Sequence, residues 1–121
     1  MQIECSYASD RPCHLMFGHL RPQSLYAELV RLSACVSLLQ ASSPSASSSS
    51  SSSSLPSPLP LAGLKIYIIH VKQPLKPDPS GLGIMTLIKR ELDELEGQAR
   101  GKGEGLGVEF IMMRRGMRIV V

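Results

Sequence analysis

An uninterrupted run of serine at residues 47–54, inside a longer Ser- and Pro-rich segment at residues 42–60, divides this chain of 121 residues in two. Such a segment carries too little apolar surface to offset the entropy lost when its backbone is ordered. Closing a longer loop costs only about 0.6 kcal/mol for each doubling of its length. We therefore expect a disordered surface insertion, with residues 1–41 and 61–121 packing together as one domain.

The composition is that of a globular chain with both helices and strands. Hydrophobic residues make up 43% and charged residues 19%, and the net charge of +3 is spread among acids. This balance indicates neither a nucleic-acid partner nor a membrane surface. Cys5, Cys13 and Cys35 form no CxxC pair and are odd in number, which is typical of free thiols in a reducing compartment. With no signal-peptide pattern and no long apolar run, we expect a cytoplasmic protein.

The part before the insertion predicts a strand followed by a helix. Apolar and polar residues alternate from Ile3 to Tyr7, so Glu4 and Ser6 share the polar face of a short strand. Pro22 suits the first turn of a helix. Apolar residues then recur at spacings of three and four along one helical face: Leu25, Leu29, Leu32, Val36 and Leu39.

The part after the insertion predicts a strand, a helix and two more strands. Residues 64–71 are apolar on both faces apart from Lys65 and His70, which is expected of a central strand covered on both sides. An amphipathic helix begins near Ile84 and ends at Gly97. A flexible glycine-rich connection then leads to strands at residues 108–113 and 117–121.

The resulting order β-α-β-α-β-β is that of an α/β fold with parallel strands and right-handed crossovers. In such sheets ligands bind beyond the carboxyl ends of the strands. Glu4 and His70 both occupy such ends. Each has a simpler explanation as well: Glu4 as a solvated surface carboxylate and His70 as a core histidine with a polar partner. His19, in a loop before the first helix, is equally consistent with backbone contacts alone.

Two blocks of sequence favour a catalytic role for these residues over the simpler explanations. The first is IECSY at residues 3–7 followed by LMFGHLRP at residues 15–22, and the second is LAGLKIYIIHVK at residues 61–72. Together and in this order they resemble the fungal class II cyclic-nucleotide phosphodiesterases of the metallo-β-lactamase superfamily. The resemblance implies the C-terminal half of a metallo-β-lactamase-like αββα sandwich. Superfamily relatives that process tRNA 3′ ends have a comparable glutamate and two histidines, which match Glu4, His19 and His70.

The resemblance also implies an activity and a role for each residue. It implies metal-dependent hydrolysis of cAMP, or of cGMP, to the 5′-monophosphate at a site with two zinc-type ions. His70 would be a metal ligand, and Glu4 with His19 would hold a proton for the departing ribose oxygen.

The metal ligands expected of such an enzyme are incomplete in this sequence. The family pattern needs an HxHxDH run, a further histidine and a bridging aspartate, whereas the histidines here are His14, His19 and His70. A catalytic zinc takes three protein ligands. We therefore expect a fragment that lacks the N-terminal half of the domain and is inactive alone.

Two alternatives remain open at this point. One is another hydrolase of the superfamily, such as a tRNA 3′-processing nuclease, which would need a basic RNA-binding arm that the sequence does not indicate. The other is a non-catalytic truncated product whose uncovered sheet edge pairs with another chain, a homodimer included.

Overall fold

The computed structural model describes residues 1–42, 59–77 and 79–119, so the expected Ser-rich insertion lies almost wholly outside the described residues. The elements in chain order are β1 (Gln2–Glu4), a 3₁₀ turn η1 (Cys13–Leu15), α1 (Pro22–Ala41), β2 (Lys65–Ile69), α2 (Ile84–Gly101) and β3 (Glu109–Met112). The fold is mixed α/β, as the alternating pattern predicted.

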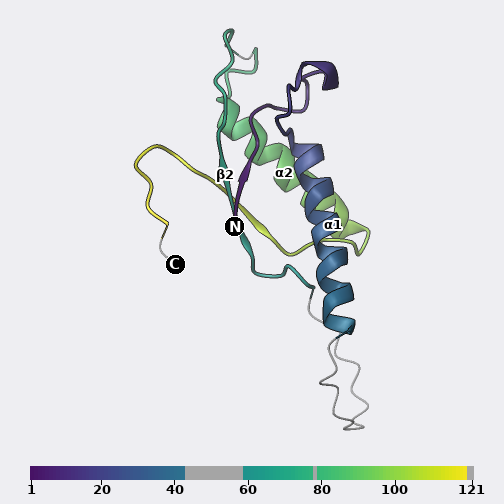
Figure 1. The fold of residues 1–121 in the computed structure, drawn as a ribbon. Helices are drawn as coiled ribbons and strands as arrows, with labels where there is room; N and C mark the ends of the chain where they lie inside the picture. The colour runs from purple at the N-terminus through teal and green to yellow at the C-terminus, as the bar shows by residue number, and fades with distance from the viewer. Residues whose placement is uncertain (43–58, 78, 120–121) are drawn as a thin grey trace.

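The three strands form one parallel sheet in the order β1-β2-β3, which confirms the predicted parallel pairing. Ile3 lies opposite Ile68, and Ile68 lies opposite Met112. Right-handed crossovers that advance in one direction across a sheet place their helices on the same face. Both helices accordingly lie on one side of the strands (Figure 1).

The core lies between this face of the sheet and the two helices. The strands contribute Ile66, Ile68 and Phe110, α1 contributes Leu25 and Leu29, and α2 contributes Ile88 and Leu92, all at most 2% exposed. Residues from both sides of the Ser-rich segment therefore share one hydrophobic cluster.

Strand β2 alternates instead of being covered on both faces. Ile66 and Ile68 are fully buried, whereas Lys65 is exposed and Tyr67 and Ile69 are half-buried. The expectation of a strand covered on both sides is therefore wrong for the described residues, because both helices lie against the same face.

Helix α1 confirms the predicted helix, but its apolar stripe is buried only over the first turns. Leu25 and Leu29 are buried, Leu32 and Val36 are partly buried, and Leu39 is 72% exposed. Leu39 belongs to the predicted helix but lies outside the core, because the last turns of α1 extend beyond the sheet (Figure 1).

Helix α2 does not end at Gly97 but continues to Gly101. A single glycine inside a helix costs about 1 kcal/mol relative to alanine, which neighbouring contacts can offset. The contacts here come from Glu96, which is 5% exposed and accepts hydrogen bonds from Tyr26 Oη at 2.6 Å and Arg100 Nε at 3.1 Å.

The glycine-rich connection is held by the same carboxylate rather than being the loose linker we expected. Glu96 also accepts hydrogen bonds from the backbone N–H groups of Leu106 at 3.1 Å and Gly107 at 2.8 Å. Leu106 and Val108 are buried on either side of Gly107. The polar anchor and the two apolar side chains together direct the chain into β3.

The C-terminal end differs from the expected fourth strand. Residues 117–119 are not in a strand, and the rest of that expected strand lies outside the described residues. No helix in the described ranges is long and apolar enough to cross a membrane.

Candidate active site

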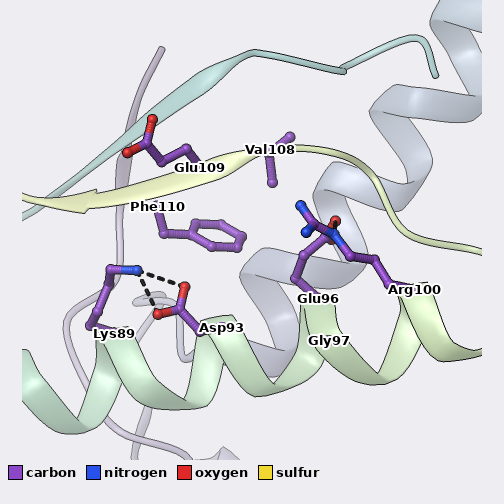
Figure 2. Close-up of a pocket in the computed structure, with 8 residues that line it drawn as sticks. All are labelled: Lys89, Asp93, Glu96, Gly97, Arg100, Val108, Glu109 and Phe110. Carbon is purple, nitrogen blue, oxygen red and sulfur yellow. Dashed lines mark hydrogen bonds and ion pairs between the residues drawn. The ribbon is translucent and has the colours of Figure 1, made fainter. Parts of the chain in front are cut away.

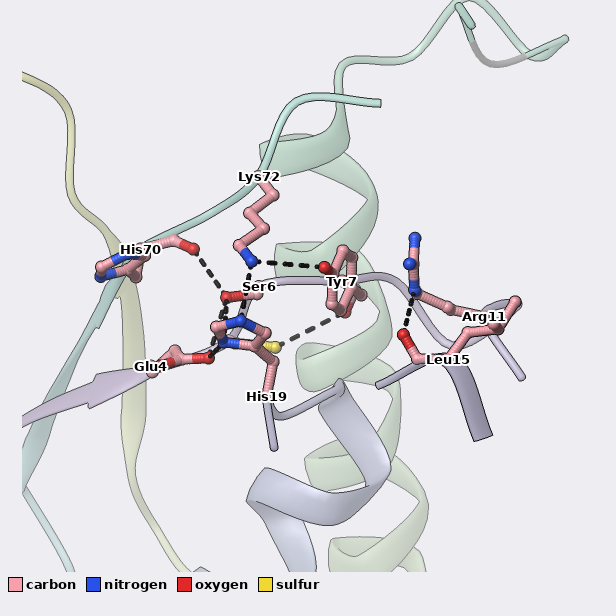
Figure 3. A network of polar contacts seen from close by, with 9 residues as sticks. Glu4, Ser6, Tyr7, Arg11, Leu15, His19, His70 and Lys72 are labelled. Atoms are coloured by element: carbon pink, nitrogen blue, oxygen red, sulfur yellow. Dashed lines mark hydrogen bonds and ion pairs between the residues drawn. The ribbon is translucent and has the colours of Figure 1, made fainter. Parts of the chain in front are cut away.

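Ser6 lies at the centre of a polar network at the carboxyl end of the sheet (Figure 3). Its side chain is fully buried, and its Oγ lies 2.9 Å from Glu4 Oε1 and 2.9 Å from the backbone oxygen of His70. Both neighbours are acceptors, so the single hydroxyl proton serves one of them at a time. The backbone continues the ladder past β1, since the N–H of Lys72 donates to the oxygen of Ser6 at 3.1 Å. Ser6 thus joins the ends of β1 and β2.

His19 reaches this network from the loop between η1 and α1. The loop turns through two left-handed residues, Phe17 with φ 48° and Gly18 with φ 80°, and the N–H of His19 donates to the oxygen of Met16 at 2.9 Å. This turn directs the imidazole toward Glu4, and His19 Nδ1 lies 2.5 Å from Glu4 Oε1. The glutamate and the loop histidine predicted from sequence are therefore in direct contact.

The contacts of the His19 ring define its tautomer. Burial by itself raises the pKa of Glu4, but hydrogen bonds from His19 and Ser6 outweigh it and lower the pKa. An ionised carboxylate only accepts, so Nδ1 of His19 carries the proton. Nε2 lies 2.7 Å from Nζ of Lys72, which donates to it. The ring also meets Tyr7 edge-on, with centroids 5.7 Å apart and an interplanar angle of 81°.

His70 follows β2 directly and has a left-handed backbone with φ 63°. His70 is an exposed residue, which rules out the simpler explanation of a core histidine with a polar partner. No described residue hydrogen-bonds to the ring, and its centroid lies 6.5 Å from that of His19, with the planes tilted by 31°. The ring nitrogens of His70 are thus accessible beside the Glu4–His19 pair.

The described residues do not form a metal site by themselves. No group of three or more His, Cys, Asp or Glu side chains among residues 1–42, 59–77 and 79–119 could hold a metal ion. Since a catalytic zinc takes three protein ligands, the exposed His70 imidazole fits the role of one ligand and no more.

Sequence reasoning gave no role to three residues of this network: Ser6, Tyr7 and Lys72. All three belong to the two blocks that carry the resemblance. Ser6 and Glu4 were expected on one face of a strand, and that shared face was the available signal. The position of Lys72 could not be read from the sequence, because it depends on β2 lying beside β1.

A hollow of about 270 Å³, apart from this network, lies between α2 and β3 (Figure 2). Lys89 is paired there with Asp93 at 2.5 Å, and Arg100 is paired with Glu96 at 3.1 Å. Its two cations are already neutralised by carboxylates of their own helix, so we assign this hollow no chemistry.

The family model for class-II cAMP phosphodiesterases matches residues 1–116. The chain belongs to this family. The polar network described above lies within the matched residues. No curated protein matches the sequence.

A solved structure supports the same fold for this class-II phosphodiesterase chain. The crystal structure of unliganded yeast PDE1 superimposes with a TM-score of 0.60 at 23% sequence identity. The match covers 95% of this chain and 24% of the yeast chain, so the chain spans about a quarter of the length of that protein.

Proposed function

We propose that this chain carries the residues that assist the leaving group in a cyclic-nucleotide phosphodiesterase, which hydrolyses cAMP or cGMP to the 5′-monophosphate. The observation that carries the proposal is the contact between Glu4 Oε1 and His19 Nδ1 at the carboxyl end of a parallel sheet. Membership of the class-II cAMP phosphodiesterase family supports the choice of reaction.

In this proposal the Glu4–His19 pair protonates the departing ribose oxygen. The Glu4 carboxylate holds Nδ1–H of His19, so Nε2 is the nitrogen that exchanges a proton with substrate. His19 first takes up a proton from water at Nε2, which forms the imidazolium. When the bond between phosphorus and the 3′ oxygen breaks, that oxygen takes this proton from Nε2, and the ring returns to its neutral form. Glu4 stabilises the imidazolium that precedes this step. General acid help of this kind contributes roughly 10²- to 10⁴-fold in rate.

The proposal includes a divalent metal site of zinc type, to which His70 contributes one imidazole ligand. Such a metal, when bound, supplies an activated water for attack on phosphorus. The remaining ligands would come from outside the described residues, in a metallo-β-lactamase-like αββα architecture completed by an N-terminal half. We also propose a cytoplasmic location, from the three cysteines that form no disulfide among the described residues.

The decisive experiment compares the 121-residue chain with a chain extended by the in-frame sequence upstream of Met1. We expect no cAMP turnover by the short chain with zinc supplied, and turnover to AMP by the extended chain. Turnover by the short chain above a buffer control would contradict our assignment of the metal ligands. An upstream stop codon in place of an HxHxDH segment would refute the catalytic proposal in favour of a non-catalytic product.

Two variants of the extended chain separate the proposed roles. His19→Asn should lower kcat by roughly 10²- to 10⁴-fold while bound zinc stays unchanged. His70→Asn should lose zinc and activity together; asparagine is chosen because it tolerates the left-handed backbone at this position. His14→Asn, in η1, is the matched control, because it removes an imidazole outside the network. A His19→Asn variant as active as His14→Asn would remove His19 from the mechanism.

A further inference from the structure

Tyr7 lies between the side chains of two cationic residues (Figure 3). The Arg11 guanidinium stacks on its ring, with Cζ 3.9 Å from the ring centroid. Lys72 Nζ lies 3.4 Å from Tyr7 Oη and 2.7 Å from His19 Nε2. Within the described residues neither Arg11 nor Lys72 forms an ion pair. Two positive charges that no described carboxylate pairs with therefore flank one phenol ring.

The same three residues line a groove of about 810 Å³, and one of them, Lys72, also contacts His19. Among the described wall residues two are acids, Glu91 and Asp10. Glu91 accepts hydrogen bonds from the N–H of Ser9 at 3.0 Å and from its Oγ at 2.8 Å, so its carboxylate faces the protein. The other acid, Asp10, is exposed. The groove thus combines cations, a phenol hydroxyl and apolar wall residues.

The protein contacts of both cations leave room for an anion. Lys72 is partly buried, and its ammonium donates to neutral acceptors only, which compensates poorly for lost hydration. The Arg11 Nε donates to the oxygen of Leu15 at 2.9 Å, which fixes the guanidinium over Tyr7. No described residue occupies its terminal nitrogens, and a guanidinium fork matches two oxygens of a phosphate.

We propose that Lys72 and Arg11, on either side of Tyr7, bind the phosphate oxyanion of a nucleotide in this groove. That the phosphate belongs to a nucleotide rests on the proposed function, whereas the oxyanion site itself does not. When the Lys72 ammonium donates to a phosphate oxygen, it no longer donates its hydrogen bond to Nε2 of His19. Phosphate binding at Lys72 thereby exposes the nitrogen that the proposed reaction uses.

The test measures binding to the 121-residue chain without turnover, by ¹H–¹⁵N correlation spectra during titration with inorganic phosphate, AMP and adenosine. We expect saturable shifts at Tyr7 and Lys72 with phosphate and AMP, and none of these with adenosine. Lys72→Met and Arg11→Met should each weaken phosphate binding by about tenfold or more, the loss of one charge-assisted hydrogen bond. Lys72→Arg should retain it. The spectra report directly whether each variant is folded.

Lys102→Met is the matched control, because it removes an exposed lysine that has no ion pair within the described residues. If it weakens phosphate binding as much as Lys72→Met, the effect is general electrostatics and the proposal is wrong. Absence of saturable phosphate shifts in the unchanged chain refutes it as well. Phosphate binding that depends on Lys72, in a protein whose extended form never hydrolyses cAMP, would support this site while refuting the catalytic proposal.

Discussion

Replacing Glu96 by alanine should destabilise this chain more than the loss of any exposed charge. The carboxylate accepts hydrogen bonds from Tyr26 Oη, from the N–H groups of Leu106 and Gly107, and from Arg100 Nε. In Glu96→Ala the first three donors remain without an acceptor in a largely buried place. Each buried donor left unsatisfied costs about 1 to 3 kcal/mol.

The three donors together give an expected loss of about 3 to 9 kcal/mol in the free energy of unfolding. The pair with Arg100 adds little, since the arginine side chain is 62% exposed and solvent screens it. A small domain has about 5 to 15 kcal/mol of stability in total. Glu96→Ala should therefore be close to unfolded at room temperature.

Urea unfolding followed by circular dichroism measures this loss. With a slope of about 1 kcal/mol per molar urea, the midpoint should fall by about 3 M or more. Glu94→Ala, two residues away, removes an exposed carboxylate paired with Arg90 at 3.0 Å and should cost less than about 0.5 kcal/mol. Adding Tyr26→Phe to Glu96→Ala should cost less than the two single changes summed, because the phenol donor is then gone as well. Equal midpoints for Glu96→Ala and Glu94→Ala would refute the reasoning.

Three further predictions follow from neighbouring features. Burial raises the pKa of Glu96, but hydrogen bonds, first from Tyr26, outweigh burial and lower this pKa, so the stability that Glu96 contributes is complete above the usual carboxyl pKa and is lost as pH falls through the folded value. In urea titrations between pH 6 and pH 3, Glu96→Gln should lose less stability on acidification than the unchanged chain. The same loss in both proteins would contradict this prediction. Gly107→Ala should lower stability by about 1 to 3 kcal/mol, because φ is +72° and the added Cβ would lie 3.2 Å from Ala62 Cα. Gly97→Ala, which has open space around the added Cβ, should instead stabilise helix α2 by about 0.5 to 1 kcal/mol. Thermal unfolding of the two variants tests this difference, and equal changes in their unfolding temperatures would overturn the prediction. Burial, with the charges of Glu91 and Glu4, raises the pKa of Cys5 to about 12. Iodoacetamide should therefore modify the exposed Cys13 and Cys35 in the folded chain and should modify Cys5 only after unfolding, which mass spectrometry measures. Rapid labelling of Cys5 in the folded chain would refute its burial.

The sequence predicted those parts of the fold that depend on local patterns. Pro22 and the apolar spacing after it located α1, and the alternation of strands with helices predicted the parallel sheet. The exposure of Leu39 could not be predicted, because periodicity reports which residues share a face and does not report how far the sheet extends under that face. The prediction that α2 ends at Gly97 was wrong because the hydrogen bonds of Glu96, which support the helix beyond this glycine, are made with groups ten and eleven residues away.

The sequence likewise predicted some features of the candidate site and not others. Glu4 and His19 were found through residues that resemble a family pattern, and their contact follows from the loop at Gly18. The exposure of the His70 ring was missed, since an apolar strand indicates burial for the strand and not for the residue that ends it. Lys72 was missed because its partners come from a different part of the sequence.

The pairing of β1 with β2 has a consequence for the order in which the chain folds. The contacts that join them, such as the Met1 ammonium with the oxygen of Lys65 and Ser6 Oγ with the oxygen of His70, link residues 64 positions apart. Contacts so distant in sequence form slowly, because a long loop must close before they contribute. Strand β1 should therefore dock late and open first. The glutamate beside His19 arrives with that strand, so the acid–base pair exists only in molecules that have completed the last step of folding.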